Sequence, residues 1–463
     1  MKPVITAPRP VRPGSALVLS LIFIAMFSAL AAAMAGMSGA NTQIAETHRK
    51  VDNARSCAES GLEVVRFWMS KVEISGTTAP AERFARLATV LQSELTDAGI
   101  TNLAPVCTSS TISVSNVPIN STLGQAFSAT LTSIDNDNIQ VDVTGHYGSF
   151  KRTIRSAYAF GTRANTVFDF GVASKGPVSL AGNVELEGVN LQVESNAYIE
   201  SENSLLALSI VGNSHIAGEV KIVNPLALVD LQGGKAGIGG ETGTAAMKHV
   251  EIGVAPCEFP EMNPATFIPY ATRVLGPGDS TSADATYENL KIPAGANPTF
   301  SGHATLKGVV FIEAPNVVTF TGDVDITGII VTNGDPTDNS AENRLVFTGN
   351  VTGHPITELP NQPQFAGLQS QTGTFIMAPG FHVGFGGSFT TLSGAIAANG
   401  IQLWGNAGGT INGSIVNYSN AQMVLQGNTD LYFNRSGLDE VPAGFVPELI
   451  LRYDPSSYTE VVL

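Results

Sequence analysis

The fold of this chain is decided by the stretch SALVLSLIFIAMFSALAAAMAGMSGA, residues 15–40, which contains no charged side chain. As an α-helix this stretch is about 39 Å long, which exceeds the roughly 30 Å thickness of a bilayer's hydrocarbon core. Lys2, Arg9 and Arg12 precede it, and the first acidic residue is Glu46. Because cationic flanks stay in the cytoplasm, we expect a single-pass membrane protein with a cytoplasmic N-terminus. The rest of the chain then lies outside the cytoplasm.

An amphipathic pattern continues directly from the apolar run. Apolar residues recur at steps of mostly three and four, which is typical of one helix face. No proline occurs between Gly14 and Pro80, so one helix can extend to about Lys71. We therefore expect a transmembrane helix over 15–40 and an amphipathic stalk helix over 41–73. The apolar stripe consists of Ile44, Val51, Ala54, Ala58, Leu62, Val65, Met69 and Val72.

The junction before the apolar run is Pro13-Gly14-Ser15, with a glycine between a basic leader and the hydrophobic stretch. An ordinary secretory signal has a shorter apolar region followed by a small-residue cleavage site. The AAAMA segment at 31–35 could be a signal-peptidase site, so an ordinary cleaved signal is one alternative. An uncleaved membrane anchor is another. The Gly-then-apolar arrangement resembles the class III signal of bacterial type IV pilins. That resemblance implies a leader peptide over 1–14, which a prepilin peptidase removes between Gly14 and Ser15.

Two further segments extend this resemblance over about residues 13–163. The helix segment NARSCAESGLE (53–63) and the stretch IQVDVTGHYGSFKRTIRSAYAF (139–160) are similar to PilX-type minor pilins. Major pilins carry a glutamate five residues into the mature chain, where this sequence has Leu19. The resemblance therefore implies a minor pilin or pseudopilin of a type IV pilus or type II secretion filament. Its implied partners are other pilin subunits and prepilin peptidase. The implied location is the inner membrane first and a periplasmic or extracellular filament after assembly.

Residues 74–164 predict a small α+β head. The segment 80–95 has its apolar residues Phe84, Leu87, Val90 and Leu91 on one helix face, with Pro80 at the first turn. Alternating residues before and after Tyr147-Gly148-Ser149 predict a β-hairpin. The stretch 102–120 is polar and rich in turn residues, so we expect a loop there.

Beyond residue 165 helix signals disappear, and short β-branched runs alternate with Gly-Asn or Gly-Asp pairs. This sequence pattern predicts an all-β domain over 165–436. We expect a right-handed parallel β-helix (β-solenoid), and a β-sandwich is the alternative. Prolines predict an interruption at 256–300, and 437–463 is expected to form a C-terminal cap or tail. The recurrent pairs are Gly182-Asn183, Gly212-Asn213, Gly322-Asp323, Gly349-Asn350, Gly405-Asn406 and Gly427-Asn428.

Composition limits the remaining partners. The formal net charge of −15 argues against nucleic acid as a ligand. The three cysteines are Cys57, Cys107 and Cys257, and a Cys107–Cys257 disulfide is one pairing that their odd number allows. The sequence indicates no cofactor.

Catalytic and metal-binding patterns are weak, so we expect neither catalytic nor metal-ligating residues. The seven histidines form no HExxH motif, and no Gly-x-Ser-x-Gly elbow occurs. Asn428-Thr429-Asp430 is similar to one pectinase motif, and Asp323 and Asp325 alternate on one strand face, but the companion motifs are missing. Two acidic loops are better interpreted as polar turns than as calcium sites. They contain Asp135 and Asp137 in one case, and Asp335, Asp338 and Glu342 in the other.

The sequence thus predicts a non-enzymatic filament subunit that displays a β-solenoid for adhesion, with a surface or carbohydrate ligand. The alternative is a membrane-anchored or secreted carbohydrate-active β-helix enzyme, which would need paired carboxylates on one face.

Overall fold

The computed structural model describes residues 14–100, 103, 105–338, 342–436 and 440–461, and the chain forms two compact units. The first unit contains the chain up to residue 74, residues 78–161 and the segment from residue 450. The second unit contains residues 75–77 and 162–449. The chain therefore enters the second unit from the first and returns to the first at its C-terminus.

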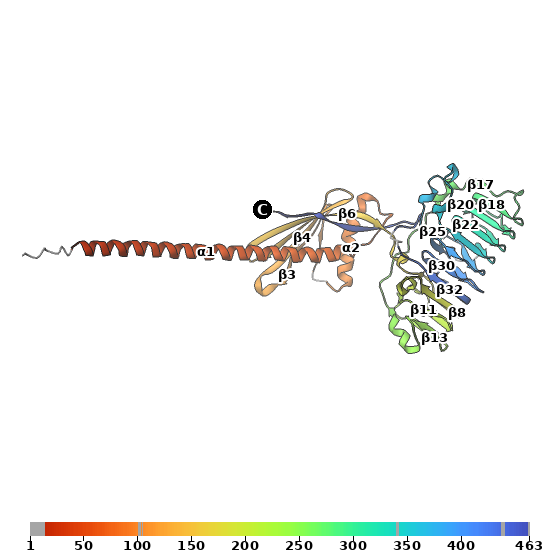
Figure 1. Cartoon of the computed structure of the whole chain (residues 1–463), viewed down its shortest axis with the longest axis horizontal. Helices are drawn as coiled ribbons and strands as arrows, with labels where there is room; N and C mark the ends of the chain where they lie inside the picture. Colours follow the sequence, from red (N-terminus) through yellow and green to blue (C-terminus); the bar gives the residue numbers. More distant parts are fainter. Residues whose placement is uncertain (1–13, 101–102, 104, 339–341, 437–439, 462–463) are drawn as a thin grey trace, which may run out of the picture. The chain divides into compact units, whose positions relative to one another are not determined.

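A single helix, α1 (Gly14–Met69), begins the first unit and is 56 residues long (Figure 1). The prediction of one uninterrupted helix across the apolar run and the amphipathic stripe is confirmed. Its last turn tightens, because the amide of Lys71 bonds to the carbonyl of Trp68. The short strand β1 begins at Ile74.

The second half of α1 packs on an antiparallel sheet of seven strands. The predicted hairpin is confirmed, with Tyr147 paired to Phe150 across the turn. The predicted loop at 102–120 is partly wrong, because a strand occupies its second half. The sheet order is β1 (Ile74–Ser75), β33 (Glu448–Val461), β6 (Phe150–Arg163), β5 (Asn138–Tyr147), β4 (Gln125–Ser133), β3 (Thr111–Asn120) and β2 (Val106–Cys107), with the 3-10 turn η2 (Ser121–Leu123) between β3 and β4.

Small residues set the distance between α1 and the sheet. Ala54 and Ala58 are fully buried, and a Cβ atom at Gly145 of β5 would collide with the helix backbone at these two residues. A Cβ atom at Gly61 would lie 2.5 Å from the ring of Phe127 on β4. The Ala-Glu-Ser-Gly segment of α1 therefore has a packing explanation, which is a close approach between helix and sheet.

A second helix completes the apolar core of the first unit, as predicted. The turn η1 (Pro80–Glu82) leads into α2 (Arg83–Asp97), whose start the fixed backbone of Pro80 favours. Its buried face consists of Phe84, Leu87, Leu91 and Leu95, and Gly99 follows in the left-handed conformation.

The C-terminal segment corrects one prediction. The sequence predicts a C-terminal cap or tail over 437–463, but in the described part of this segment strand β33 lies between β6 and β1 in the sheet of the first unit. Ser457 accepts a hydrogen bond from the amide of Ala157 at 2.7 Å, and Tyr453 packs against Tyr158 at 5.4 Å. Pro455 is tolerated because β1 has only two residues, which leaves most of the outer edge of β33 unpaired.

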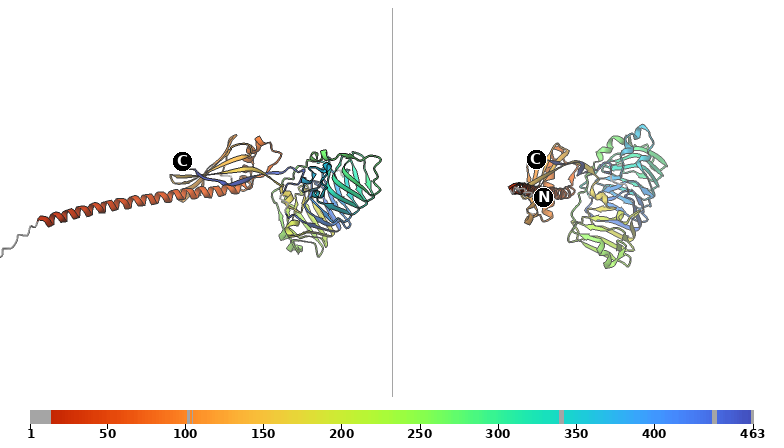
Figure 2. Two further views of the ribbon diagram at one scale, coloured as in Figure 1. Left: turned by 45° about the horizontal axis from the view of Figure 1, so that its top comes forward. Right: turned by 60° about the vertical axis from the view of Figure 1, so that its left-hand side comes forward.

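Two large sheets form the second unit, and the chain alternates between them (Figure 2). One sheet has 12 strands: β7 (Val172–Ser174), β9 (Ala197–Ile199), β12 (Val220–Ile222), β16 (Val250–Ile252), β17 (Arg273–Val274), β18 (Ala285–Ile292), β20 (Ala304–Ile312), β22 (Val324–Thr332), β24 (Val351–His354), β25 (Thr374–Ala378), β28 (Ala395–Ala398) and β31 (Ile415–Asn417).

The other sheet has 14 strands: β8 (Val178–Gly188), β10 (Leu206–Gly212), β11 (His215–Ile216), β13 (Leu228–Gln232), β14 (Gly237–Ile238), β15 (Glu241–Thr242), β19 (Thr299–Phe300), β21 (Val317–Phe320), β23 (Arg344–Phe347), β26 (His382–Phe385), β27 (Thr391–Leu392), β29 (Ile401–Leu403), β30 (Gly409–Ile411) and β32 (Met423–Phe433). Short 3-10 turns connect the strands: η3 (Thr166–Asp169), η4 (Gln192–Ser195), η5 (Gly243–His249), η6 (Pro264–Tyr270), η7 (Ile356–Glu358), η8 (Pro363–Phe365) and η9 (Leu368–Ser370).

Strands that neighbour one another in these sheets run parallel, as in the pairing of β20 with β22, except for β14 with β15. This differs from the antiparallel pairing of the β-sandwich alternative. In-register pairing brings like side chains together. Phe300, Phe320, Phe347 and Phe385 form a buried column with ring centroids 4.7 to 5.1 Å apart.

The strands do not stack in chain order. The first pair, β7 and β8, lies beside the last pair, β31 and β32, in the middle of the stack. The strands that follow β7 and β8 lie successively closer to one end of the stack, which is reached at β16. Residues 253–272 then connect β16 to β17, which lies at the opposite end. It returns strand by strand to β32.

The crossing segment explains the proline-rich interruption, although the predicted range 256–300 is too long because β18 already begins at Ala285. The segment packs on the 12-stranded sheet. The ring of Phe259 contacts Tyr418 at 5.4 Å, and the Tyr418 hydroxyl donates to the carbonyl of Pro260 at 2.6 Å. Phe267 is fully buried in the same layer.

An ion pair with a buried carboxylate lies where the chain enters and leaves the second unit. Arg163, at the end of β6, donates from Nε to Glu448 at 2.9 Å, and the Glu448 side chain is 2% exposed. Thr166 also donates to Glu448, from its amide and its hydroxyl. Both oxygens of this buried carboxylate therefore accept hydrogen bonds, which offsets its desolvation.

Candidate functional site

The exposed half of α1 is the largest candidate interaction surface. This helix alone, among the described residues, is long and apolar enough to span a membrane. Large apolar side chains cover all its faces and are exposed in this chain. They are Leu17, Val18, Leu19, Leu21, Ile22, Phe23, Ile24, Met26, Phe27, Leu30, Met34, Met37 and Ile44. Such a surface requires lipid or neighbouring helices around it.

The predicted cleavage site lies at the beginning of this helix. Gly14 is the first residue of α1 and Ser15 the second. The leader residues 1–13 lie outside the described residues, so cleavage between Gly14 and Ser15 stays a prediction.

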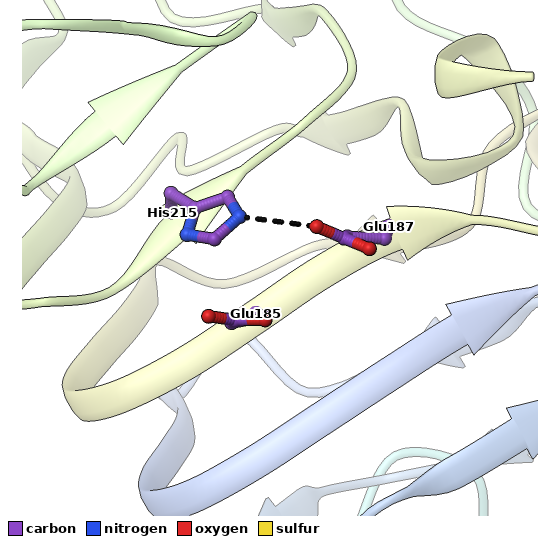
Figure 3. Close-up of side chains that lie close together, drawn as sticks. All are labelled: Glu185, Glu187 and His215. Carbon is purple, nitrogen blue, oxygen red and sulfur yellow. Dashed lines mark hydrogen bonds and ion pairs between the residues drawn. The ribbon is translucent and has the colours of Figure 1, made fainter.

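A cluster of two carboxylates and one imidazole lies on the 14-stranded sheet (Figure 3). Glu185 and Glu187 both lie on β8, and His215 lies in register with Glu185 on the neighbouring β11. Their ligand atoms are all within 4.8 Å of one another, and His215 Nε2 is 3.5 Å from a Glu187 oxygen. Alternation along β8 points both glutamates to the same side of the sheet.

The cluster continues onto the last strand of the unit. On β32, Asp430 pairs with Glu185, and Tyr432 pairs with Glu187. Burial raises the pKa of Tyr432, and the negative charges of Asp430, Glu187 and Glu185 raise it further. The site is therefore a half-exposed, electronegative patch at the junction of the first and last layers of the stack.

This arrangement has two chemical capacities. One imidazole nitrogen and two carboxylate oxygens could ligate a divalent transition metal. Carboxylates on one face could also serve acid–base chemistry on a polysaccharide. The contact between His215 and Glu187 already explains the geometry as a cross-strand pair, so the cluster alone establishes neither capacity.

The other acidic residues singled out from the sequence lie apart from this cluster in local polar contacts. Asp325 lies 2.9 Å from His303 Nε2, and Asp323 accepts from the amide and side chain of Asn350. Hydrogen bonds from Thr337 lower the pKa of Asp335, and those from Asn138 and the Asp137 amide lower the pKa of Asp135. In their described residues, both acidic loops thus contain hydrogen bonds typical of polar turns, as predicted.

The cysteines form no disulfide in the described part of the chain, which contains all three. Cys57 is buried in α1, and burial raises the pKa of its thiol. Cys107 is exposed on β2 of the first unit, whereas Cys257 is half-buried in the second. The Cys107–Cys257 pairing, which would join the two units, stays a prediction.

Sequence reasoning missed the cluster although it identified the signal that locates it. Gly182, Gly212 and Gly427 lie in register on neighbouring strands, each with a positive φ angle. Glu185, His215 and Asp430 each follow one of these glycines by three positions. Aligning the chain on its recurrent Gly-Asn pairs would have placed the three side chains together.

Comparison with known proteins gives few matches. No protein-family model matches the chain, and no curated protein matches its sequence. Among solved structures, one similar chain is the competence-associated pilin ComZ from Thermus thermophilus. The match covers 78% of this chain and 88% of that chain, with 11% sequence identity and a TM-score of 0.28. A similarity this low does not carry an argument about fold or function.

Proposed function

We propose that this chain is a non-enzymatic structural subunit of a membrane-derived filament, a minor pilin or pseudopilin. The supporting observation is the division of α1 into two environments. Its first half exposes large apolar side chains on every face, whereas its second half packs one face, through small residues, against an antiparallel sheet. One continuous helix of this kind serves as a membrane anchor before assembly and as a helix-packing element afterwards.

The finer assignment is to the PilX-like subunits of a type IV pilus or a type II secretion filament. Leu19, in place of the acid found in major pilins, supports a minor or tip position. In-register parallel strands that alternate between two sheets support a β-solenoid as the displayed domain. In this proposal prepilin peptidase cleaves after Gly14, α1 contacts other pilin subunits, and the second unit is presented for adhesion.

The test is the mature N-terminus, measured by mass spectrometry of the protein from its own membrane fraction. We expect a chain that starts at Ser15. Gly14→Leu should leave the full-length precursor in the membrane, and Gly36→Leu, with open space around it, is the matched control. A start beyond residue 31 would mean that the helix is discarded, and normal processing of Gly14→Leu would refute the prepilin-peptidase assignment.

A carbohydrate-active enzyme is the second candidate, and one observation favours it. Glu185 and Asp430 are paired on adjacent strands, which lie about 4.8 Å apart in a sheet. Polygalacturonate cleavage by the purified full chain, abolished in Glu185→Gln and Asp430→Asn but kept in Asp323→Asn, would establish this candidate. Absence of cleavage by the unaltered chain would leave the structural role.

A further inference from the structure

A groove on the outer surface of the 14-stranded sheet is a second, separate site. It has a volume of about 470 Å³, which falls in the usual range for small-molecule sites. Strands β23, β26, β29 and β32 supply its walls, together with the loop before β32. The residues that argue for a ligand are Arg344, His382, Gly384, Gln402, Trp404 and Gln422.

Two outward positions beside this groove carry no side chain, because Gly384 on β26 and Gly386 directly after it are glycines. A Cβ atom at Gly384 would lie 2.7 Å from the indole of Trp404, and one at Gly386 would lie 2.6 Å from it. Real Cβ atoms do not approach that closely, so the indole rests directly on glycine backbone. Trp404 therefore lies against these two glycines and is partly exposed in the groove.

Polar side chains form much of the remaining lining, and on β29 they alternate with buried apolar ones. Gln402 and Trp404 alternate with the buried Ile401 and Leu403, so both point outward from β29. Gln422 is exposed directly before β32, and Arg344 is exposed on β23. The aromatic ring is thus surrounded by amide groups, which donate and accept hydrogen bonds, and by a guanidinium group, which only donates them.

We propose that this groove binds a pyranose ring of an oligosaccharide. A pyranose has one apolar face of C–H bonds and a rim of hydroxyl groups. The C–H hydrogens match the electron-rich face of an indole, and the hydroxyls match side-chain amides that both donate and accept. This inference deepens the proposed adhesive function by naming its ligand class, and it rests on that function for its biological meaning.

Other ligand classes fit the groove less well. A nucleic acid would be repelled by a chain with a formal net charge of −15. A peptide strand adds to a sheet edge, whereas the backbone groups of β26 and β29 are already paired with neighbouring strands on both sides. A purely apolar ligand would leave the glutamine amides without partners.

The chain's two tryptophans, Trp68 and Trp404, allow a direct test. In the full-length Trp68→Phe variant, all tryptophan fluorescence comes from Trp404. The purified protein, held in lauryldimethylamine oxide because that detergent carries no sugar, is titrated with cellohexaose, mannohexaose, maltohexaose and chitohexaose. We expect a saturable emission change with at least one probe and a Kd of about 10 μM to 1 mM.

Two variants locate the binding and separate it from folding. Gly384→Ala lifts the indole from its seat, and Gln402→Ala removes one exposed amide without disturbing the core. Each should weaken binding of the responding probe at least tenfold by calorimetry, while hydrogen exchange of the second unit stays unchanged. Glu251→Ala, exposed on β16, is the matched control and should bind normally.

The outcomes distinguish this inference from the proposed function. No saturable change with any probe, or binding that both variants retain, would overturn the inference, although a mature N-terminus at Ser15 would still support the pilin role. Binding with probe cleavage, lost in both variants, would support the site and overturn the non-enzymatic role.

Discussion

The two units of this chain bury their apolar side chains by opposite means. In the first unit a helix approaches an antiparallel sheet so closely that the important positions are the smallest residues, Ala54, Ala58 and Gly145. In the second unit parallel strands repeat large residues in register, and the important positions are the largest, as in the phenylalanine column. The first unit should therefore be sensitive to added volume and the second to lost volume.

The largest effect should come from adding volume between helix and sheet. In Gly145→Val the new side chain meets the backbone of α1, which cannot rotate away as a side chain does. We expect the first unit to lose its packed structure, because the cost exceeds the roughly 1–3 kcal/mol of ordinary overpacking. Hydrogen exchange of β4, β5 and the second half of α1 measures this. Gly36→Val, with no atom within 4 Å, is the control, and equal protection in both variants would contradict the comparison.

Removing volume from the phenylalanine column should give the next largest effect. Phe347 is fully buried between Phe320 and Phe385, at 5.1 Å from each ring centroid. Phe347→Ala should cost about 3–5 kcal/mol, and Phe347→Leu, which leaves a smaller cavity, should cost clearly less. Exchange of β21, β23 and β26 should rise while the first unit stays protected. Loss of protection in both units would show that they unfold together.

A smaller effect is expected where the chain passes between the units. Glu448→Gln keeps the shape of the side chain but removes the charge that faces Arg163. Since the Arg163 side chain is 36% exposed, water relieves part of the imbalance, and we expect a loss of about 2 kcal/mol. The measurement is chemical unfolding of the second unit, with Glu440→Gln, an exposed acid, as the control. An unchanged midpoint would show that hydrogen bonds to Thr166 suffice.

The smallest effect concerns a single carboxyl after β9. Burial raises the pKa of Glu200 to about 6, against an ordinary value of 4.5. Because the folded state holds the Glu200 proton more tightly than the unfolded state, protonation stabilises the fold fully when the pH is below the ordinary pKa of 4.5. This stabilisation is lost as the pH rises through the raised pKa of about 6. From about pH 5 to pH 7.5 the loss should be about 1 kcal/mol. Glu200→Gln should remove this loss from the second unit's unfolding midpoint, whereas Glu251→Gln should not. Identical pH profiles would refute the assignment.

Local patterns predicted the elements whose partners are close in the sequence. The helix α1, the helix α2 and the hairpin of β5 and β6 each carry a complete pattern of their own. The strand β3 was missed because most of its residues are partly or fully exposed, which leaves no alternation to detect.

Local sequence patterns could not predict the pairing of strands that lie far apart in the chain. Strand β33 contains Pro455, and its partner β6 lies almost the whole second unit earlier in the chain, so nothing nearby indicates a strand. The same holds for Glu185, which meets His215 through the pairing of β8 with β11 and meets Asp430 only because the first and last layers are neighbours. The recurrent glycines carried that information, but only as a register between distant segments.

The position of β33 has a consequence for biosynthesis. In the expected topology the N-terminal helix enters the membrane first, while the strand that completes the sheet beside it is synthesised last. The middle of the parallel stack also cannot form until β32 has been synthesised, because β32 is the strand that pairs with β8. Both units therefore reach their final state only after nearly the whole chain has been synthesised. A chain truncated before residue 448 is expected to leave the edge of β6 open, a site for wrong strand pairing, which makes the C-terminus a check on complete synthesis.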